Sequence, residues 1–130
     1  ARARATELTG KSISAQSYAL RHNVPEADGL RVDPRVFEVH PELAFGAMAG
    51  RILRTGERSW KGASERRGVL ASAGLVLPSD LGAGGAVPVD DVLDAAAAAW
   101  SARRIARGEA DRVPEAPELD EHRRPVAIWY

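Results

Sequence analysis

The sequence predicts a helix-rich domain of the α/β class with a few short strands, and three segments carry that prediction. Residues 35–40 combine β-branched, aromatic and charged side chains between two prolines, which is typical of a strand. Residues 90–107 contain a run of five alanines and end before a glycine, which is typical of a helix. Residues 126–130 are apolar enough to return to the core or to pair as a strand.

The N-terminal third is expected to be helical and then to form a connection. Residues 2–8 resemble the end of a helix that stops near Gly10, and Ser12 or Ser14 can cap a second helix that runs to about Leu20. Residues 22–34 contain two prolines and a glycine, so we expect a loop there.

The middle of the chain predicts two helices. Pro41 suits the first turn of a helix that reaches about Met48 and closes at Gly50. Residues 51–60 have no regular pattern, and residues 63–73 predict a helix that ends at Gly74. Residues 75–77 are a short apolar run that a proline interrupts.

The last third is built around the alanine-rich segment. Residues 79–88 predict a loop, and Asp90 is the expected N-cap of a helix that reaches Arg107 and ends at Gly108. Before Trp100 no side of this helix is polar apart from its aspartates, which predicts burial all round. Residues 111–124 are rich in proline and charge and predict a surface excursion, and the whole chain, residues 1–130, is interpreted as one domain.

Composition removes several classes of function. Lys and Arg together number 18, as do Asp and Glu, so no global positive field attracts nucleic acid. The absence of cysteine excludes disulfides, thiolate zinc sites and cysteine nucleophiles. No apolar run approaches the ~20 residues that cross a membrane, and no secretory signal is recognisable, so we expect a cytoplasmic protein that does not enter membranes.

Three carboxylates form the candidate catalytic and metal site. Asp91 and Asp94 are three residues apart and therefore share one face of the alanine-rich helix. Glu38 lies between two apolar residues of the predicted strand and points away from them. If the helix and the strand pack on that side, the three carboxylates suit Mg²⁺ or Mn²⁺. These ions bind phosphate as well and support phosphodiester hydrolysis. The plainer alternative is that the aspartates complement the helix dipole and Glu38 faces solvent.

Several other side chains are possible auxiliaries. His40 projects to the same side as Glu38 and is either a proton shuttle or an ordinary capping or core histidine. Glu42 is either a further ligand or a favourable acid in a first helical turn. Lys61, with Arg66 and Arg67, contacts phosphate or belongs to a solvated helix face. The tryptophans Trp60, Trp100 and Trp129 could stack on bases only if exposed, and Trp100 is expected in the core.

These motifs resemble a known family. Residues 38–42 (Glu-Val-His-Pro-Glu), residues 90–95 and the terminal Ile-Trp-Tyr, supported by residues 10–16 and 60–67, are similar to the family catalogued as domain of unknown function 429. That family is regarded as predicted nucleases with a ribonuclease H-like fold. The resemblance implies that Glu38 is the ligand on a strand and that Asp91 and Asp94 are the ligands on a C-terminal helix.

The chain departs from that pattern at its beginning. Families of this kind start with a strand that carries Asp and a glycine-rich turn, which the sequence lacks. The resemblance therefore implies the C-terminal portion of a ribonuclease H-like domain, without its N-terminal strands and one ligand. Exposed apolar faces would then favour association, either as a homo-oligomer or with the missing N-terminal half of the same protein.

Two functional hypotheses follow. The first is a metal-dependent nuclease whose metal-bound water attacks a phosphodiester in DNA, RNA or a small ester. This activity is expected of the full-length protein and not of this part alone. The second is a noncatalytic binding or assembly module on the same fold, which the neutral charge and the missing strand favour.

Overall fold

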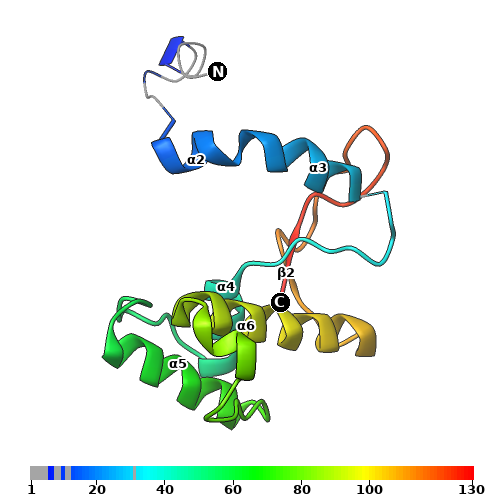
Figure 1. Ribbon diagram of the computed structural model, residues 1–130. Coiled ribbons are helices and arrows are strands. Elements are labelled where there is room, and N and C mark those ends of the chain that lie inside the picture. The colour runs from blue at the N-terminus through cyan, green and yellow to red at the C-terminus, as the bar shows by residue number, and fades with distance from the viewer. Residues whose placement is uncertain (1–5, 8–9, 11–12, 31) are drawn as a thin grey trace. The chain divides into compact units, whose positions relative to one another are not determined.

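The computed structural model describes residues 6–7, 10, 13–30 and 32–130, and its elements are drawn in Figure 1. The chain divides into two compact units, Ala1–Phe37 and Glu38–Tyr130. Across the described residues it is helix-rich with two short strands, as expected from the sequence. Each unit is considered separately below.

The first unit is helical for longer than the sequence predicts. Helix α2 (Ala15–Ala19) continues through a 3₁₀ turn, η1 (Leu20–His22), into α3 (Asn23–Leu30). The loop predicted for residues 22–34 is therefore wrong over most of its length. Pro25 lies in the first turn of α3, where its missing N–H is not needed, so it does not interrupt the helix. None of the residues of α3 is buried.

The helix predicted for residues 2–8 falls mainly outside the described residues. Thr6 and Glu7 are helical, and the amide of Gly10 donates to the carbonyl oxygen of Thr6 at 2.9 Å. Gly10 adopts φ 70°, the left-handed conformation that commonly ends a helix. The described part of this segment thus ends where the sequence predicts.

The strand predicted for residues 35–40 is reduced to a single bridge. Val39 pairs in parallel with Trp129, and the Trp129 amide donates to the Glu38 carbonyl oxygen at 2.8 Å. Upstream, the Asp33 carboxylate accepts from the backbone amide and the guanidinium of Arg35, which holds a local turn. The turn takes up the residues that the prediction assigned to the start of the strand.

The core of the second unit lies between three helices that contact one another: α4 (Pro41–Ala49), α5 (Trp60–Ser72) and α6 (Val89–Arg107) (Figure 1). Each contributes a side chain with almost no exposed surface, namely Phe45, Leu70 and Leu93. Burial of large apolar side chains of this kind is the main favourable term in folding. The three helices therefore form the framework that positions any site in this unit.

The sheet is small. Strands β1 (Arg112–Val113) and β2 (Ile128–Trp129) pair antiparallel, with Val113 opposite Ile128. Because Val39 bridges to Trp129, β2 lies between β1 and the Glu38–Val39 backbone. The expected return of residues 126–130 as a strand is confirmed, and Ala127 beside it is buried.

Helix ends follow their capping residues with small shifts. Gly50 and Gly108 adopt φ 64° and 68° and end α4 and α6 as predicted. Helix α5 starts three residues earlier than predicted, because the Ser59 side chain accepts from the Gly62 amide at 3.0 Å and caps it. Asp90 is not the N-cap of α6, because Pro88 occupies that position. The loop before α6 contains a 3₁₀ turn, η2 (Gly82–Ala86).

Two glycines of α5 differ in what surrounds them. A Cβ at Gly62 would lie 2.0 Å from the carbonyl oxygen of Gly56, whereas a Cβ at Gly68 would meet nothing within 4 Å. The loop before α5 thus lies directly against the first turns of the helix. Only a residue without a side chain fits at this approach.

We expect Gly62→Ala to lower the free energy of unfolding by about 1–3 kcal/mol, since the loop or the helix must shift. Gly68→Ala is the matched control, and we expect it to stabilise the protein by up to ~1 kcal/mol through helix propensity. Urea denaturation followed by circular dichroism measures both. Equal stability of the two variants would mean that the loop does not contact α5 in this way.

Candidate functional site

Helix α6 is buried on one face only, so the prediction of burial all round is wrong. Leu93, Ala97 and Trp100 are buried, whereas Ala95 and Ala99 are exposed. Alanines are small and give little indication of which face is inward, so the larger Leu93 and Trp100 decide the orientation. As a consequence, Asp91 is exposed and Asp94 is half-buried.

The buried acid of α6 is Asp90, which the sequence analysis did not select as a ligand. Its side chain is 11% exposed, and Arg58 Nε donates to its Oδ2 at 2.7 Å. This hydrogen bond holds the pKa of the Asp90 carboxyl below its usual value. The spacing of Asp90 from Leu93 and Ala97 could have indicated the inward position, because residues three and seven apart share a helix face.

A second acid, Glu42 in the first turn of α4, is held by a buried arginine. Arg66 is 2% exposed, and its Nε and Nη2 donate to Glu42 Oε1 at 3.0 and 2.8 Å. Its Nη1 donates to the carbonyl oxygens of Thr55 and Gly62 at 3.1 and 3.3 Å. Arg66 is thus neither on a solvated face nor free to contact phosphate, and Glu42 has a structural partner.

Asp94 differs from these two acids. Within the described residues it has no hydrogen-bond or ion-pair partner, although it is half-buried. Burial, followed by the charges of the carboxylates Glu57, Glu42, Asp90 and Asp91, raises the pKa of the Asp94 carboxyl above its usual value. The ionised form of Asp94 is therefore disfavoured in the folded protein, and a cation or a proton at this position would relieve the repulsion.

The predicted ligands are not gathered into one cluster. In the part of the chain that the structure describes, no group of three or more His, Asp or Glu side chains is placed to hold a metal ion. Asp91 and Asp94 lie near each other on α6. Glu38 is exposed on another segment, and its carbonyl oxygen is hydrogen-bonded to β2. The role of all three as ligands stays a prediction.

The predicted auxiliaries lie in different places. His40 is the exposed residue before α4, and its side chain makes no cap hydrogen bond. Lys61 is exposed in the first turn of α5. Glu42 is the one auxiliary whose charge acts on Asp94.

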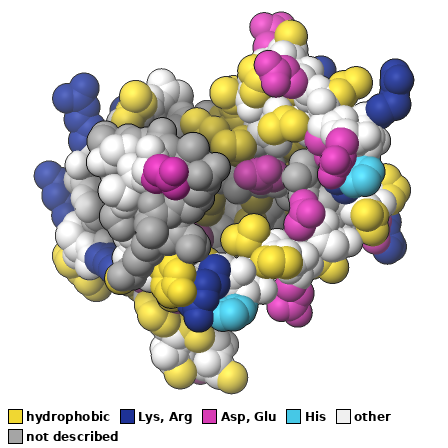
Figure 2. All heavy atoms as spheres, turned by 90° about the horizontal axis from the view of Figure 1, so that it is seen from above, with side chains coloured by type: hydrophobic (Ala, Val, Ile, Leu, Met, Phe, Trp, Pro, Cys, Tyr) yellow, Lys and Arg dark blue, Asp and Glu magenta, His cyan; other side chains and the backbone are white. Residues whose placement is uncertain are grey.

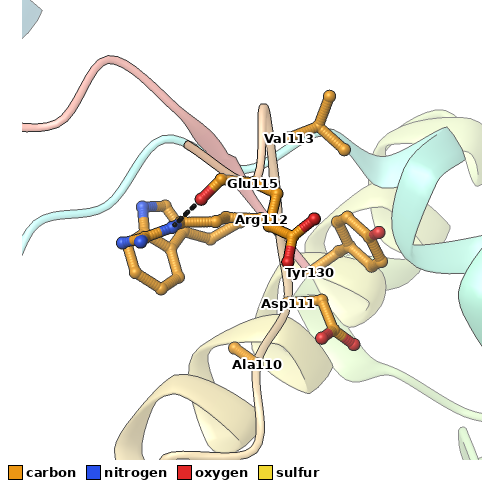
Figure 3. A pocket seen from close by; sticks show the side chains of 7 residues that line it. Ala110, Asp111, Arg112, Val113, Glu115 and Tyr130 are labelled. Atoms are coloured by element: carbon orange, nitrogen blue, oxygen red, sulfur yellow. Dashed lines mark hydrogen bonds between the residues drawn. The ribbon is translucent and has the colours of Figure 1, made fainter. Parts of the chain in front are cut away.

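Two hollows lie on the second unit. One, of about 680 Å³, is lined mainly by apolar atoms of α4 and the following segment, including Leu43, Ile52 and Tyr130. The other, of about 570 Å³, is shown in Figure 3, where Asp111 and Tyr130 lie on one side and the Arg112 side chain extends to the other. Arg112 lies over the Trp129 ring at 5.2 Å and donates to the Glu115 carbonyl oxygen at 3.2 Å.

The surface carries charges of both signs. On the face shown in Figure 2, acidic, basic and hydrophobic side chains are interspersed, in accord with the balanced composition of the chain. The described basic side chains visible there are scattered and do not form one patch. Attraction of an anionic ligand would therefore depend on local groups of arginine and lysine.

The helix-rich second unit belongs to a chain whose family is described without an assigned function. The chain is a member of the family described as "Protein of unknown function (DUF429)", whose model matches residues 1–119. No curated protein and no solved structure matches the chain. Within its described residues, no helix combines the length and apolar character needed to cross a membrane.

The raised pKa of Asp94 predicts a pH-dependent effect on stability. The pKa of Asp94 in the folded protein lies above the ordinary aspartate value, so the unfavourable contribution is absent in acid below that value and develops as the pH rises through the folded pKa. We expect Asp94→Asn to be more stable than the wild type at pH 7, by less than about 1 kcal/mol because the site is partly screened by solvent. The difference should disappear in acid.

Urea denaturation between pH 3 and 8 measures this difference. Glu118→Gln is the charge-matched control, since this exposed side chain has no described partner, and it should show no such trend. A destabilised Asp94→Asn at neutral pH would show that a positive group compensates the Asp94 carboxylate.

Proposed function

We propose that the protein is a metal-dependent nuclease that hydrolyses phosphodiesters, with Asp94 as its central carboxylate. The observation that carries the proposal is the state of Asp94, which is half-buried, repelled by four neighbouring carboxylates and without a cation among the described residues. Its neighbours Glu42 and Asp90 each have an arginine, whereas Asp94 has no cationic partner among the described residues. A divalent cation would supply that missing positive charge.

The donor set suits a hard divalent ion that keeps most of its water. Mg²⁺ and Mn²⁺ commonly use one or two carboxylates and complete their shell with water and substrate phosphate. Asp94 and Asp91 provide that smaller set, while Glu38, the third predicted ligand, would have to approach them. When bound, the ion would supply an activated water and stabilise the leaving oxygen.

The residues around Asp94 would orient and tune it. Arg58 and Arg66 fix Asp90 and Glu42, so these two acids contribute charge to the site without competing as freely moving ligands. The predicted ribonuclease H-like fold, and a further ligand from another chain or another part of the same protein, belong to this proposal. The resemblance of residues 38–42 and 90–95 to the motifs expected of such a fold supports it.

Metal binding and cleavage test the proposal together. We expect Mn²⁺ to bind the wild-type chain in isothermal titration calorimetry and Asp94→Asn to weaken that binding. In the full-length protein, we expect Asp94→Asn to lower cleavage of a labelled mixture of DNA and RNA by at least about 100-fold. Replacing a residue that only supports a metal ligand already lowers metal affinity or activity by ~10–100-fold.

Glu118→Gln serves as the control and should retain both properties. Unchanged Mn²⁺ binding and unchanged cleavage in Asp94→Asn would refute the role of Asp94. Cleavage that persists in excess chelator would refute a metal-dependent mechanism.

A second candidate function, a noncatalytic binding or assembly module, is favoured by the apolar hollow beside α4. Ile52 at its rim is 81% exposed, and an apolar side chain of that size gains free energy when a partner covers it. Light scattering separates the candidates. A stable oligomer that Ile52→Ser dissociates, in a protein without Mn²⁺ binding, would favour assembly over catalysis.

A further inference from the structure

Trp60 is the most exposed large apolar side chain of the second unit. Its side chain is 88% exposed at the first position of α5. By contrast, Trp100 is 7% exposed and Trp129 is half-buried beneath Arg112. Of the three tryptophans, only Trp60 therefore presents nearly its whole indole ring to a ligand.

Cationic and neutral residues share a helix face with this ring. The residues at positions 60, 64 and 67 share one face of α5 because of the helical repeat, and Lys61 lies beside them. We call the residues Trp60, Lys61, Ser64 and Arg67 the Trp60 face, and all four are exposed. The carboxylate of α5, Glu65, is turned to Arg51 and Thr55 instead.

The positive charge extends to the segment before the helix. Arg54 is exposed and has no partner among the described residues. Arg58 is 78% exposed and uses Nε for Asp90, while no described group binds its two terminal nitrogens. Arg67 donates one weak bond, from Nη2 to the Leu77 carbonyl oxygen at 3.4 Å.

We propose that the Trp60 face is a binding subsite for single-stranded nucleic acid, in which a base stacks on the indole of Trp60 and phosphates meet Lys61 and Arg67. The inference rests on the proposed nuclease function and names its substrate class. Proteins commonly bind unpaired strands through exposed aromatic rings that lie next to cationic side chains. Each base can stack on a ring through its π face, and each phosphodiester linkage carries a negative charge for the cations. A duplex keeps its bases stacked within the helix and cannot offer them in this way.

The position of the face agrees with that role. Arg58 comes two residues before Trp60 and bonds to Asp90 in the first turn of α6, the turn that leads to Asp91 and Asp94. The segment before α5 is thus hydrogen-bonded to the first turn of α6. In the proposed subsite, a strand stacked on Trp60 would continue from there toward Asp91 and Asp94.

The composition of the face favours an anionic ligand over a protein partner. The indole ring is followed by lysine, serine and arginine rather than by further large apolar residues. Protein interfaces usually bury a contiguous apolar centre and are depleted in lysine. Phosphates instead pair with both cations of the face.

Fluorescence anisotropy in excess chelator tests the subsite without cleavage, so the result does not depend on Asp94. The probes are a labelled oligothymidylate, an abasic oligomer with the same number of phosphates, and a duplex. We expect Trp60→Ala to weaken binding of the oligothymidylate by about 5- to 100-fold, the range that corresponds to ~1–3 kcal/mol per stacked base. Binding of the abasic oligomer should not change.

Two further variants separate stacking from charge. Lys61→Gln should lower the slope of log affinity against log salt by about 0.7, the value for one phosphate on a single strand. Val76→Ala, which shortens another highly exposed apolar side chain, is the control for Trp60→Ala and should bind like the wild type. The emission of Trp60, identified by its absence in Trp60→Phe, should be quenched by the oligothymidylate.

Two outcomes would overturn the subsite. The first is wild-type affinity in Trp60→Ala, and a change of oligomeric state in the same variant would then assign the ring to a protein contact. The second is an equal loss for the oligothymidylate, the abasic oligomer and the duplex. If Asp94→Asn still cleaves but Trp60→Ala loses strand binding, the subsite stands and the proposed catalytic role of Asp94 fails.

Discussion

The guanidinium of Arg66 holds several parts of the second unit in place relative to one another. It joins the first turn of α4 through Glu42, the loop before α5 through the Thr55 carbonyl oxygen, and α5 itself through the Gly62 carbonyl oxygen. A buried charge without such partners is strongly unfavourable, so these groups must keep their positions together. The position of the loop in turn fixes Arg58 and the start of α5.

This arrangement divides the acids of the site into two kinds. Glu42 and Asp90 are bound by arginines, and their charges are held in place. Asp94 experiences those charges without a partner of its own among the described residues. Burial and the neighbouring carboxylates therefore disfavour the ionised form of Asp94, even though the chain as a whole is neutral.

The sequence predicts some elements well because their signals are local. Pro41 and Gly50 bound α4, and Gly108 ends α6, through backbone preferences that do not depend on the rest of the fold. Other elements depend on context. Pro25 lies in the first turn of α3 and does not break it, and Asp33 replaces the beginning of a strand by a turn.

The site was less predictable than the fold, since its contacts are distant in sequence. The partners in Glu42–Arg66 and Arg58–Asp90 are 24 and 32 residues apart, and neither pair follows from spacing. An alanine-rich helix also conceals which acid faces inward, so Asp90 was assigned to the cap and Asp91 to the site. Trp60 was recognised as a stacking candidate from its type, but only its exposure separates it from Trp100.

The bond between Arg58 and Asp90 has a consequence for how the family varies. Because Asp90 is nearly buried, loss of Arg58 leaves its carboxylate without a compensating charge, and related chains should exchange the pair together or keep it whole. Asp94 has no such reciprocal partner among the described residues, so its variation should follow function alone. If positions 58 and 90 change together in related chains while position 94 changes independently of them, that pattern would result from the hydrogen bond between Arg58 and Asp90.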